Sequence, residues 1–334
     1  MLESSVQFAV CAFIIVVAGT LLTRFADAIA EITKLGRLVI GSVLLAGTTS
    51  LPEITVDISA IRMGMPDIAV GDLLGSSLAN LAILALLDLS NHSQGKMLSR
   101  QAAAHALSGS LSAALTAIVG IGLLTGKALA EYAVFGVSPI CILVAVVYAF
   151  GARMIYLDQR IAMKEVPPEE PGAHPGMTLG KAALGFAVCG TAILIAGPYL
   201  ASAGGRLAEE TGLGKTFVGS TLVAFSTSLP ELVSSLAALR LGAIDLAIGN
   251  VFGSNAFNMI ILLPLDAIEP GPLFATVAPT HAVTCVAAIL ATMIANMGQL
   301  YRAETRVRFI EPDAWLIIAC VIGAMALLYY LPAL

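Results

Sequence analysis

Two glutamates, Glu53 and Glu231, each follow a proline inside a long apolar stretch, in the sequence Thr-Ser-Leu-Pro-Glu. Proline lacks a backbone N–H and its ring clashes with the carbonyl four residues earlier, so an α-helix is interrupted there. The freed carbonyls of Thr48 and Ser226 would be costly in hydrocarbon unless another group binds them. Carbonyl, hydroxyl and carboxylate oxygens gather at each break, and hard cations such as Ca²⁺ prefer such ligands.

Hydroxyl side chains precede each glutamate at helical spacing. Thr49 and Ser50 stand four and three residues before Glu53, which places them on or near its helix face. The same spacing recurs before the second glutamate. The predicted cation ligands on these two spans are therefore Glu53, Thr49, Ser50, Glu231, Thr227 and Ser228.

A polar stripe follows on the next apolar span of each copy, with its members at four-residue intervals along one helix face. The stripe consists of Asp72, Ser76 and Asn80 in the first copy and of Asn250, Ser254 and Asn258 in the second. Glycines beside it leave room for close helix approach. They are Gly71, Gly75, Gly249 and Gly253.

Other acids and the histidines are less directly informative. Asp57 lies one turn after Glu53, and it either widens the site or faces a water-filled vestibule. Asp88 and Asp266 close their spans, where we expect a solvated end. The histidines are scattered, and we expect them to be paired or hydrated; they are His92, His105, His174 and His281.

The two glutamates supply a charge of minus two, which balances one divalent cation or is shared among monovalent ones. A cavity that holds either Ca²⁺ or Na⁺, and is unstable when empty, would exchange one ion for the other. No His, Cys or Met cluster lies at these positions, which argues against softer transition metals. Protons remain an alternative driving ion, because burial disfavours the charged form of a carboxylate.

Both motifs belong to a duplicated segment. Residues 35–88 return as residues 213–266 at an offset of 178 without a gap, and 24 of the 54 aligned positions are identical. Apolar composition alone would not repeat a Pro-Glu step. The duplication indicates a function built symmetrically from two halves.

The composition is that of a polytopic membrane protein: 58% hydrophobic residues, 12% charged residues and a mean hydropathy of +0.93. We therefore predict an all-α fold of ten transmembrane helices. The first run follows Met-Leu-Glu-Ser-Ser, without positive charge, so we expect a retained helix. The apolar runs cover residues 6–23, 38–61, 68–90, 102–125, 132–152, 180–203, 216–239, 244–268, 273–297 and 314–333.

Five spans fall in each half, and an odd number of spans requires the two copies to enter the membrane in opposite orientations. With the N-terminus outside, thirteen of the 17 basic residues fall on the cytoplasmic side. The other side carries Arg62, Lys127, Arg206 and Lys215. The positive-inside rule therefore places both termini outside and the central linker in the cytoplasm, in a plasma (inner) membrane protein.

The predicted domain organisation follows the duplication. Residues 1–155 form the first five-helix half, residues 156–178 a proline-rich cytoplasmic linker, and residues 179–334 the second half. The expected partners are inorganic cations and the lipid bilayer, with no cofactor, nucleic acid or protein partner.

The duplicated Thr-Ser-Leu-Pro-Glu and Gly-x-x-x-Gly-Ser segments resemble the two α-repeats of the cation/calcium exchanger superfamily, most of all the prokaryotic sodium/calcium exchangers. The resemblance implies two inverted five-helix halves, with the first and sixth helices sliding across the core to switch access. It also implies which residues of this chain bind Na⁺ and Ca²⁺, because they stand at the family's ligand positions. These fall on Glu53 and Glu231 as calcium carboxylates, on Thr49, Ser50, Thr227, Ser228, Ser76, Asn80 and Ser254, and on the backbone of Ala46 and Ala224.

Two positions depart from the family pattern. Sodium/calcium exchangers typically carry an Asp where this chain has Asn258, and their first repeat usually reads Gly-Asn where this one reads Gly71-Asp72. The first departure removes a titratable group from the site and the second adds one a little over two turns away. These two departures leave both Na⁺ and H⁺ open as the coupled ion.

The leading prediction is a secondary active antiporter that exchanges Ca²⁺ for Na⁺ by alternating access. The alternative within transport is an antiporter that couples to H⁺ or moves another divalent cation. An intramembrane enzyme is the alternative of a different class. The sequence lacks the Tyr-Asp of membrane aspartyl proteases and the His-Glu-x-x-His of zinc proteases, so we predict that the protein is not an enzyme.

Overall fold

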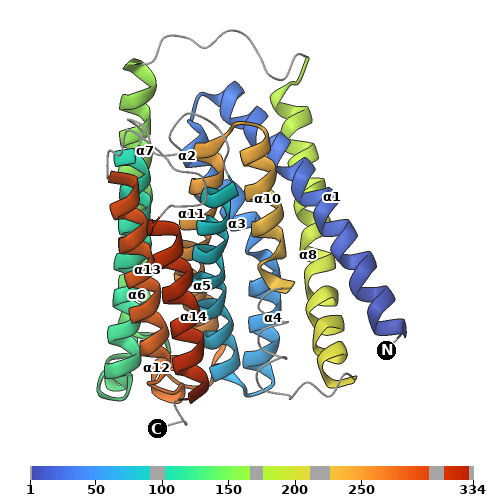
Figure 1. Cartoon of the computed structure of the whole chain (residues 1–334). Coiled ribbons are helices and arrows are strands. Elements are labelled where there is room, and N and C mark those ends of the chain that lie inside the picture. The colour runs from blue at the N-terminus through green and yellow to red at the C-terminus, as the bar shows by residue number, and fades with distance from the viewer. Residues whose placement is uncertain (1, 91–101, 166–175, 211–225, 301–311, 331–334) are drawn as a thin grey trace.

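The computed structural model describes residues 2–90, 102–165, 176–210, 226–300 and 312–330 as a bundle of helices (Figure 1). The first half begins with one long helix, continues with a span broken into several pieces, and ends with three long helices. Its elements are α1 (Leu2–Thr33), α2 (Arg37–Val39), the π-helical turn η1 (Ile40–Leu45), α3 (Ala46–Thr49), α4 (Leu51–Arg62), α5 (Pro66–Ser90), α6 (Ala102–Leu129), the 3₁₀ turn η2 (Ala130–Tyr132) and α7 (Pro139–Glu165).

The second half repeats this order as far as it is described. Its elements are α8 (Leu179–Glu210), α10 (Leu229–Arg240), α11 (Ile244–Ile268), the short α12 (Leu273–Thr276), α13 (His281–Leu300) and α14 (Pro312–Tyr330). The fold class is therefore confirmed as that of an all-helical membrane protein with broken helices.

Within the described residues, seven helices are long and apolar enough to cross a membrane. An eighth span consists of the segments Arg37–Thr49 and Leu51–Arg62, which meet at an angle of 42°. The predicted span 216–239 lies partly outside the described residues, and α14 contains a shorter apolar helix, Pro312–Leu328. The predicted start of the ninth span at residue 273 is wrong, because α12 and a turn at Pro279 precede α13.

The predicted helix breaks are confirmed in both copies. Ser50 has φ −84° and ψ 8°, and Ser228 has φ −82° and ψ 2°, so neither residue continues the helix before it. A proline then occupies the first turn of α4 and of α10, where its missing N–H costs no hydrogen bond. The broken geometry exposes backbone and hydroxyl groups beside Glu53 and Glu231.

The helices that follow the two breaks, α4 and α10, end in the same way. Gly64 has a φ of 72° and Gly242 a φ of 73°, values that favour glycine. The Met65 N–H donates to the Ala60 carbonyl at 2.9 Å, and the Ala243 N–H of the second copy donates to its equivalent carbonyl at 2.9 Å. These Schellman caps turn α4 into α5 and α10 into α11, which brings each polar stripe back alongside its glutamate.

The ends of the helices agree with an odd number of spans in each half. The start of α1 and the end of α14 lie at one end of the bundle, while α7 ends and α8 begins at the other (Figure 1). The start of α1 and the end of α14 would therefore face one side of a membrane, and the end of α7 and the start of α8 the other. The count of basic residues predicts that the side of the termini is the outside.

Helices α1 and α8 lie against one another and cover the two broken spans. A Cβ atom at Gly19 of α1 would lie 3.1 Å from Val233 of α10, and one at Gly197 of α8 would lie 2.4 Å from Pro52 of α4. The Thr23 hydroxyl also lies 3.2 Å from the Ser234 carbonyl. The first helix of each half thus contacts the broken span of the other half through glycine-sized gaps.

Asp266 corrects one expectation from the sequence. Its side chain is fully buried, whereas we expected a solvated helix end; Asp88 is only partly buried. The Asp266 carboxylate accepts hydrogen bonds from the backbone N–H groups of Ser138 at 2.6 Å and Leu273 at 2.8 Å. The carboxylate therefore joins the end of α11 to the starts of α7 and α12.

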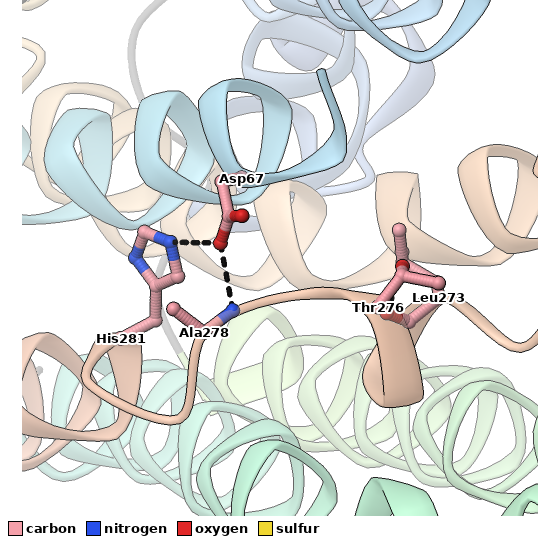
Figure 2. A network of polar contacts seen from close by, with 5 residues as sticks. All are labelled: Asp67, Leu273, Thr276, Ala278 and His281. Atoms are coloured by element: carbon pink, nitrogen blue, oxygen red, sulfur yellow. Dashed lines mark hydrogen bonds and ion pairs between the residues drawn. The ribbon is translucent and has the colours of Figure 1, made fainter. Parts of the chain in front are cut away.

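Two of the four histidines are paired with aspartates. His281 Nε2 lies 3.2 Å from Asp67 Oδ1, and the Ala278 N–H donates to the same oxygen at 2.7 Å (Figure 2). Nearby, the Thr276 hydroxyl donates to the Leu273 carbonyl at 2.8 Å (Figure 2). The two contacts of Asp67 join the start of α5 to the connection before α13. His105 lies 2.8 Å from Asp245, and His92 and His174 lie outside the described residues.

Candidate cation site

Glu53 and Glu231 come from opposite copies and meet in the core. Glu53 lies in the first turn of α4 and Glu231 in the first turn of α10, with exposed fractions of 1% and 0%. Their carboxylates are close enough for their charges to repel each other. The Ser50 hydroxyl donates to Glu231 Oε1 at 3.2 Å, so the break in one copy reaches the glutamate of the other. The two predicted half-sites therefore form one site.

Several buried oxygens of this site have no hydrogen-bond partner in the described part of the chain. They are the Oε2 atoms of Glu53 and Glu231, the hydroxyls of Ser76, Ser228 and Ser254, and the side-chain oxygens of Asn80 and Asn258. A buried polar atom without a partner costs about 1–3 kcal/mol. A set composed entirely of carboxylate, hydroxyl and amide oxygens matches the ligands of a hard cation.

The side-chain amide nitrogens of Asn80 and Asn258 donate hydrogen bonds to residues of the opposite copy. The Asn80 amide donates to Asn255 Oδ1 at 3.0 Å. The Asn258 amide donates to the Leu73 carbonyl at 3.3 Å and lies 3.5 Å from the Ser77 hydroxyl. Because the amide nitrogens donate to other residues of the protein, the side-chain oxygens remain available to accept a hydrogen bond or to bind a cation. Sequence reasoning missed Asn255 and Ser77, which stand one position after the stripe residues Ser254 and Ser76.

The threonines of the two breaks face the stripe of the opposite copy. The Thr49 hydroxyl lies 3.2 Å from the Ala46 carbonyl and 3.4 Å from Asn250 Oδ1. In the mirrored position, the Thr227 hydroxyl interacts with Asp72. Thr49 and Ala46 are fully buried beside the site, whereas Ala224 lies outside the described residues.

The site is more acidic than its two glutamates alone. Asp57 and Asp72 are also buried, with exposed fractions of 0% and 9%, and their charges act on Glu53. Asp57 therefore does not face a water-filled vestibule in this structure. Among the described residues no Lys or Arg side chain is buried. Cations from outside the protein are the natural partners for buried carboxylates that no basic side chain compensates.

The ligand set is not that of a transition-metal centre. Within the residues that the structure describes, no three His, Cys, Asp or Glu side chains form a compact metal-binding cluster. Hydroxyl, amide and backbone oxygens therefore make up most of the possible coordination shell, together with single carboxylates. Such ligands suit Ca²⁺ and Na⁺ better than softer ions.

The glycines of the second copy allow close backbone approach, as the sequence predicts. A Cβ atom at Gly253 of α11 would lie 2.4 Å from the Cα and carbonyl oxygen of Ser42 in η1. One at Gly249 would lie 2.8 Å from the Leu38 carbonyl. At Gly75, nothing among the described residues lies within 4 Å, and residues 218–223, which would mirror η1, are outside them.

The model of the family "Sodium/calcium exchanger protein" matches residues 4–150 and 181–334, which is nearly the whole chain. The chain belongs to the sodium/calcium exchanger family. It is therefore an integral membrane antiporter of the cation/calcium exchanger type and not an enzyme.

Relatives and solved structures agree with this assignment. The putative antiporter CaxA of Alkalimonas amylolytica is 30% identical over 83% of this chain and 85% of its own length. The inner membrane protein YrbG of Escherichia coli (strain K12) is 30% identical over 71% of each chain. A structure of the sodium-calcium exchanger NCX_Mj superimposes with a TM-score of 0.71 at 20% identity and covers 98% of both chains, which shows a common fold.

Proposed function

We propose that this exchanger moves Ca²⁺ across the membrane in exchange for Na⁺, at a mid-membrane site shared by the two copies. The observation that carries the proposal is the convergence of Glu53 and Glu231, each with a buried and unpartnered Oε2 atom. A carboxylate within a membrane span costs roughly 2.5–3.5 kcal/mol, and two at equivalent positions require a compensating ligand. One divalent cation neutralises both.

The proposed ligands surround this pair of glutamates. They come from the hydroxyls and carbonyls of the helix breaks and from the polar stripes of α5 and α11. The proposed set is Glu53, Glu231, Thr49, Ser50, Thr227, Ser228, Ser76, Asn80, Ser254, Asn258 and Asp72, with the backbone of Ala46 and Ala224.

Access to the site would alternate through movement of α1 and α8. These helices contact the broken spans at Gly19 and Gly197, where the absence of side chains permits sliding. A core that holds either one Ca²⁺ or several Na⁺ would let these helices move only when its carboxylates are neutralised. The same requirement couples the two ion fluxes.

The membrane in which the protein resides can also be inferred. The relative YrbG is described as an inner membrane protein. We infer a plasma (inner) membrane location for this chain, with both termini outside and the linker, residues 156–178, in the cytoplasm.

Purified protein reconstituted into sealed vesicles should take up labelled Ca²⁺ when Na⁺ is loaded inside and diluted outside. Collapse of the Na⁺ gradient with an ionophore should stop the uptake, because the outward movement of Na⁺ supplies the driving force. Uptake that ignores Na⁺ and follows an imposed pH gradient would contradict Na⁺ coupling and favour the H⁺-coupled alternative. Vesicles without protein serve as the control.

A further inference from the structure

Asp57 of α4 and Asp72 of α5 face one another beside the central site. Both carboxylate oxygens of Asp57 and the Oδ2 atom of Asp72 are buried and have no hydrogen-bond partner among the described residues. Asp57 precedes the turn at residues 63–65 by six residues, and Asp72 follows that turn by seven. Both residues therefore lie between the central site and the turn. The transport proposal above, which rests on Glu53 and Glu231, leaves Asp57 without a role.

The second copy shows which side chains the same hairpin carries at the positions of Asp57 and Asp72. At the offset of 178, Asp57 aligns with Ser235 and Asp72 with Asn250. The Asn250 amide donates to the Ser235 hydroxyl at 2.9 Å, so this equivalent pair is neutral and bonded to itself. The hairpin therefore packs without any charge at these positions. The two carboxylates of the first copy are not explained by the folding of the hairpin.

Among the described residues, the surroundings of the acidic pair contain further acidic side chains and no buried basic one. Glu53 is close enough to repel both aspartates, Glu231 also repels Asp72, and the Thr227 hydroxyl that contacts Asp72 carries no charge. No Lys or Arg side chain is buried in the part of the chain that the structure describes. Two adjacent buried carboxylates without a basic partner are unfavourable when both are ionised, and either a shared proton or a bound cation relieves the repulsion.

We propose that Asp57 and Asp72 bind a second hard metal cation, next to the one held by Glu53 and Glu231. The inference rests on the proposed exchange of hard cations, and it adds a site that only the first copy supplies. This site lies toward the end of the bundle where α1 begins, while the neutral pair of the second copy lies toward the opposite end (Figure 1). The two sides of the central site are therefore unlike in charge, and the second cation would be held on the side of the 63–65 turn.

The test is to give the first copy the neutral pair of the second, with the double variant Asp57→Ser, Asp72→Asn. Equilibrium binding of labelled Ca²⁺ and, separately, of labelled Na⁺ is measured on full-length purified protein in detergent. We expect the variant to bind about one cation per protein fewer than the unmodified chain for at least one of the two ions. In Asp57→Asn, which leaves every proposed ligand of the central site in place, the binding that depends on Glu53 and Glu231 should persist. Asp57→Asn alone, which preserves side-chain size, gives the same test if the double variant does not fold.

The outcomes separate this inference from the proposed function. Equal numbers of bound Ca²⁺ and of bound Na⁺ in the unmodified chain and the variant would overturn the second site and leave the central site standing. Failure of the unmodified chain to bind either ion would overturn both. A loss confined to Na⁺ or to Ca²⁺ supports the second site and identifies its ion.

Discussion

Replacing either Glu53 or Glu231 with glutamine should abolish cation exchange and leave folded protein in the membrane. Glutamine has nearly the same size but no charge, so the packing of α4 and α10 is preserved while half of the central negative charge is lost. Removing one charged partner from a buried contact costs at least about 2 kcal/mol, or roughly 30-fold in affinity. Because the glutamates come from equivalent positions in the two copies, each substitution should be equally damaging.

The measurement is Na⁺-driven uptake of labelled Ca²⁺ by each variant in vesicles, with the elution profile of the detergent-purified protein as the check on folding. Glu31→Gln is a matched control, because Glu31 is an exposed glutamate of α1 outside the site. Near-normal Ca²⁺ flux in Glu53→Gln or in Glu231→Gln would end the assignment of the site.

Gly253→Val should destabilise the protein and stop transport by forcing two backbones apart. The new Cβ atom would lie 2.4 Å from the Cα and carbonyl oxygen of Ser42, where α11 packs on η1. Inserting atoms into a packed core typically costs about 1–3 kcal/mol, and here neither neighbour is a flexible side chain that could move aside. The displacement would also shift Ser254 and Asn258 relative to the broken span.

Thermal unfolding in detergent, followed by vesicle uptake, measures both effects of this substitution. Gly323→Val in α14 is the control, because no atom lies within 4 Å of a Cβ built at that position and the residue is exposed. An unfolding midpoint and an uptake rate for Gly253→Val that match those of the control would show that the contact between α11 and η1 is not tight.

The features that sequence reasoning predicted well are local ones. Proline interrupts a helix through its own ring and its missing N–H, so the breaks at Ser50 and Ser228 follow from the residue type alone. A carboxylate inside an apolar run is costly wherever it lies, which singled out Glu53 and Glu231. Their meeting in one site follows from the duplication, because a repeat with an odd number of spans is inverted.

The features that the sequence did not reveal depend on contacts between distant segments. The sequence predicts that Asp266 is solvated at a helix end, because it does not show that the starts of α7 and α12 pack against this residue. Asn255 lies one position off the predicted stripe, and only the packing of α5 on α11 brings its side chain to Asn80. Likewise, the burial of Asp57 beside Asp72 depends on the 63–65 turn. The boundaries of the two halves and of the linker stay predictions.

The central claim is that one cation is held jointly by the two copies. Its most direct test is to locate Ca²⁺ by anomalous scattering in crystals of the protein grown with that ion. We predict an ion within the usual Ca²⁺ to oxygen distance, about 2.3–2.6 Å, of a carboxylate oxygen of Glu53 and of one of Glu231. An ion bound by residues of one copy alone, or bound away from both glutamates, would contradict the claim.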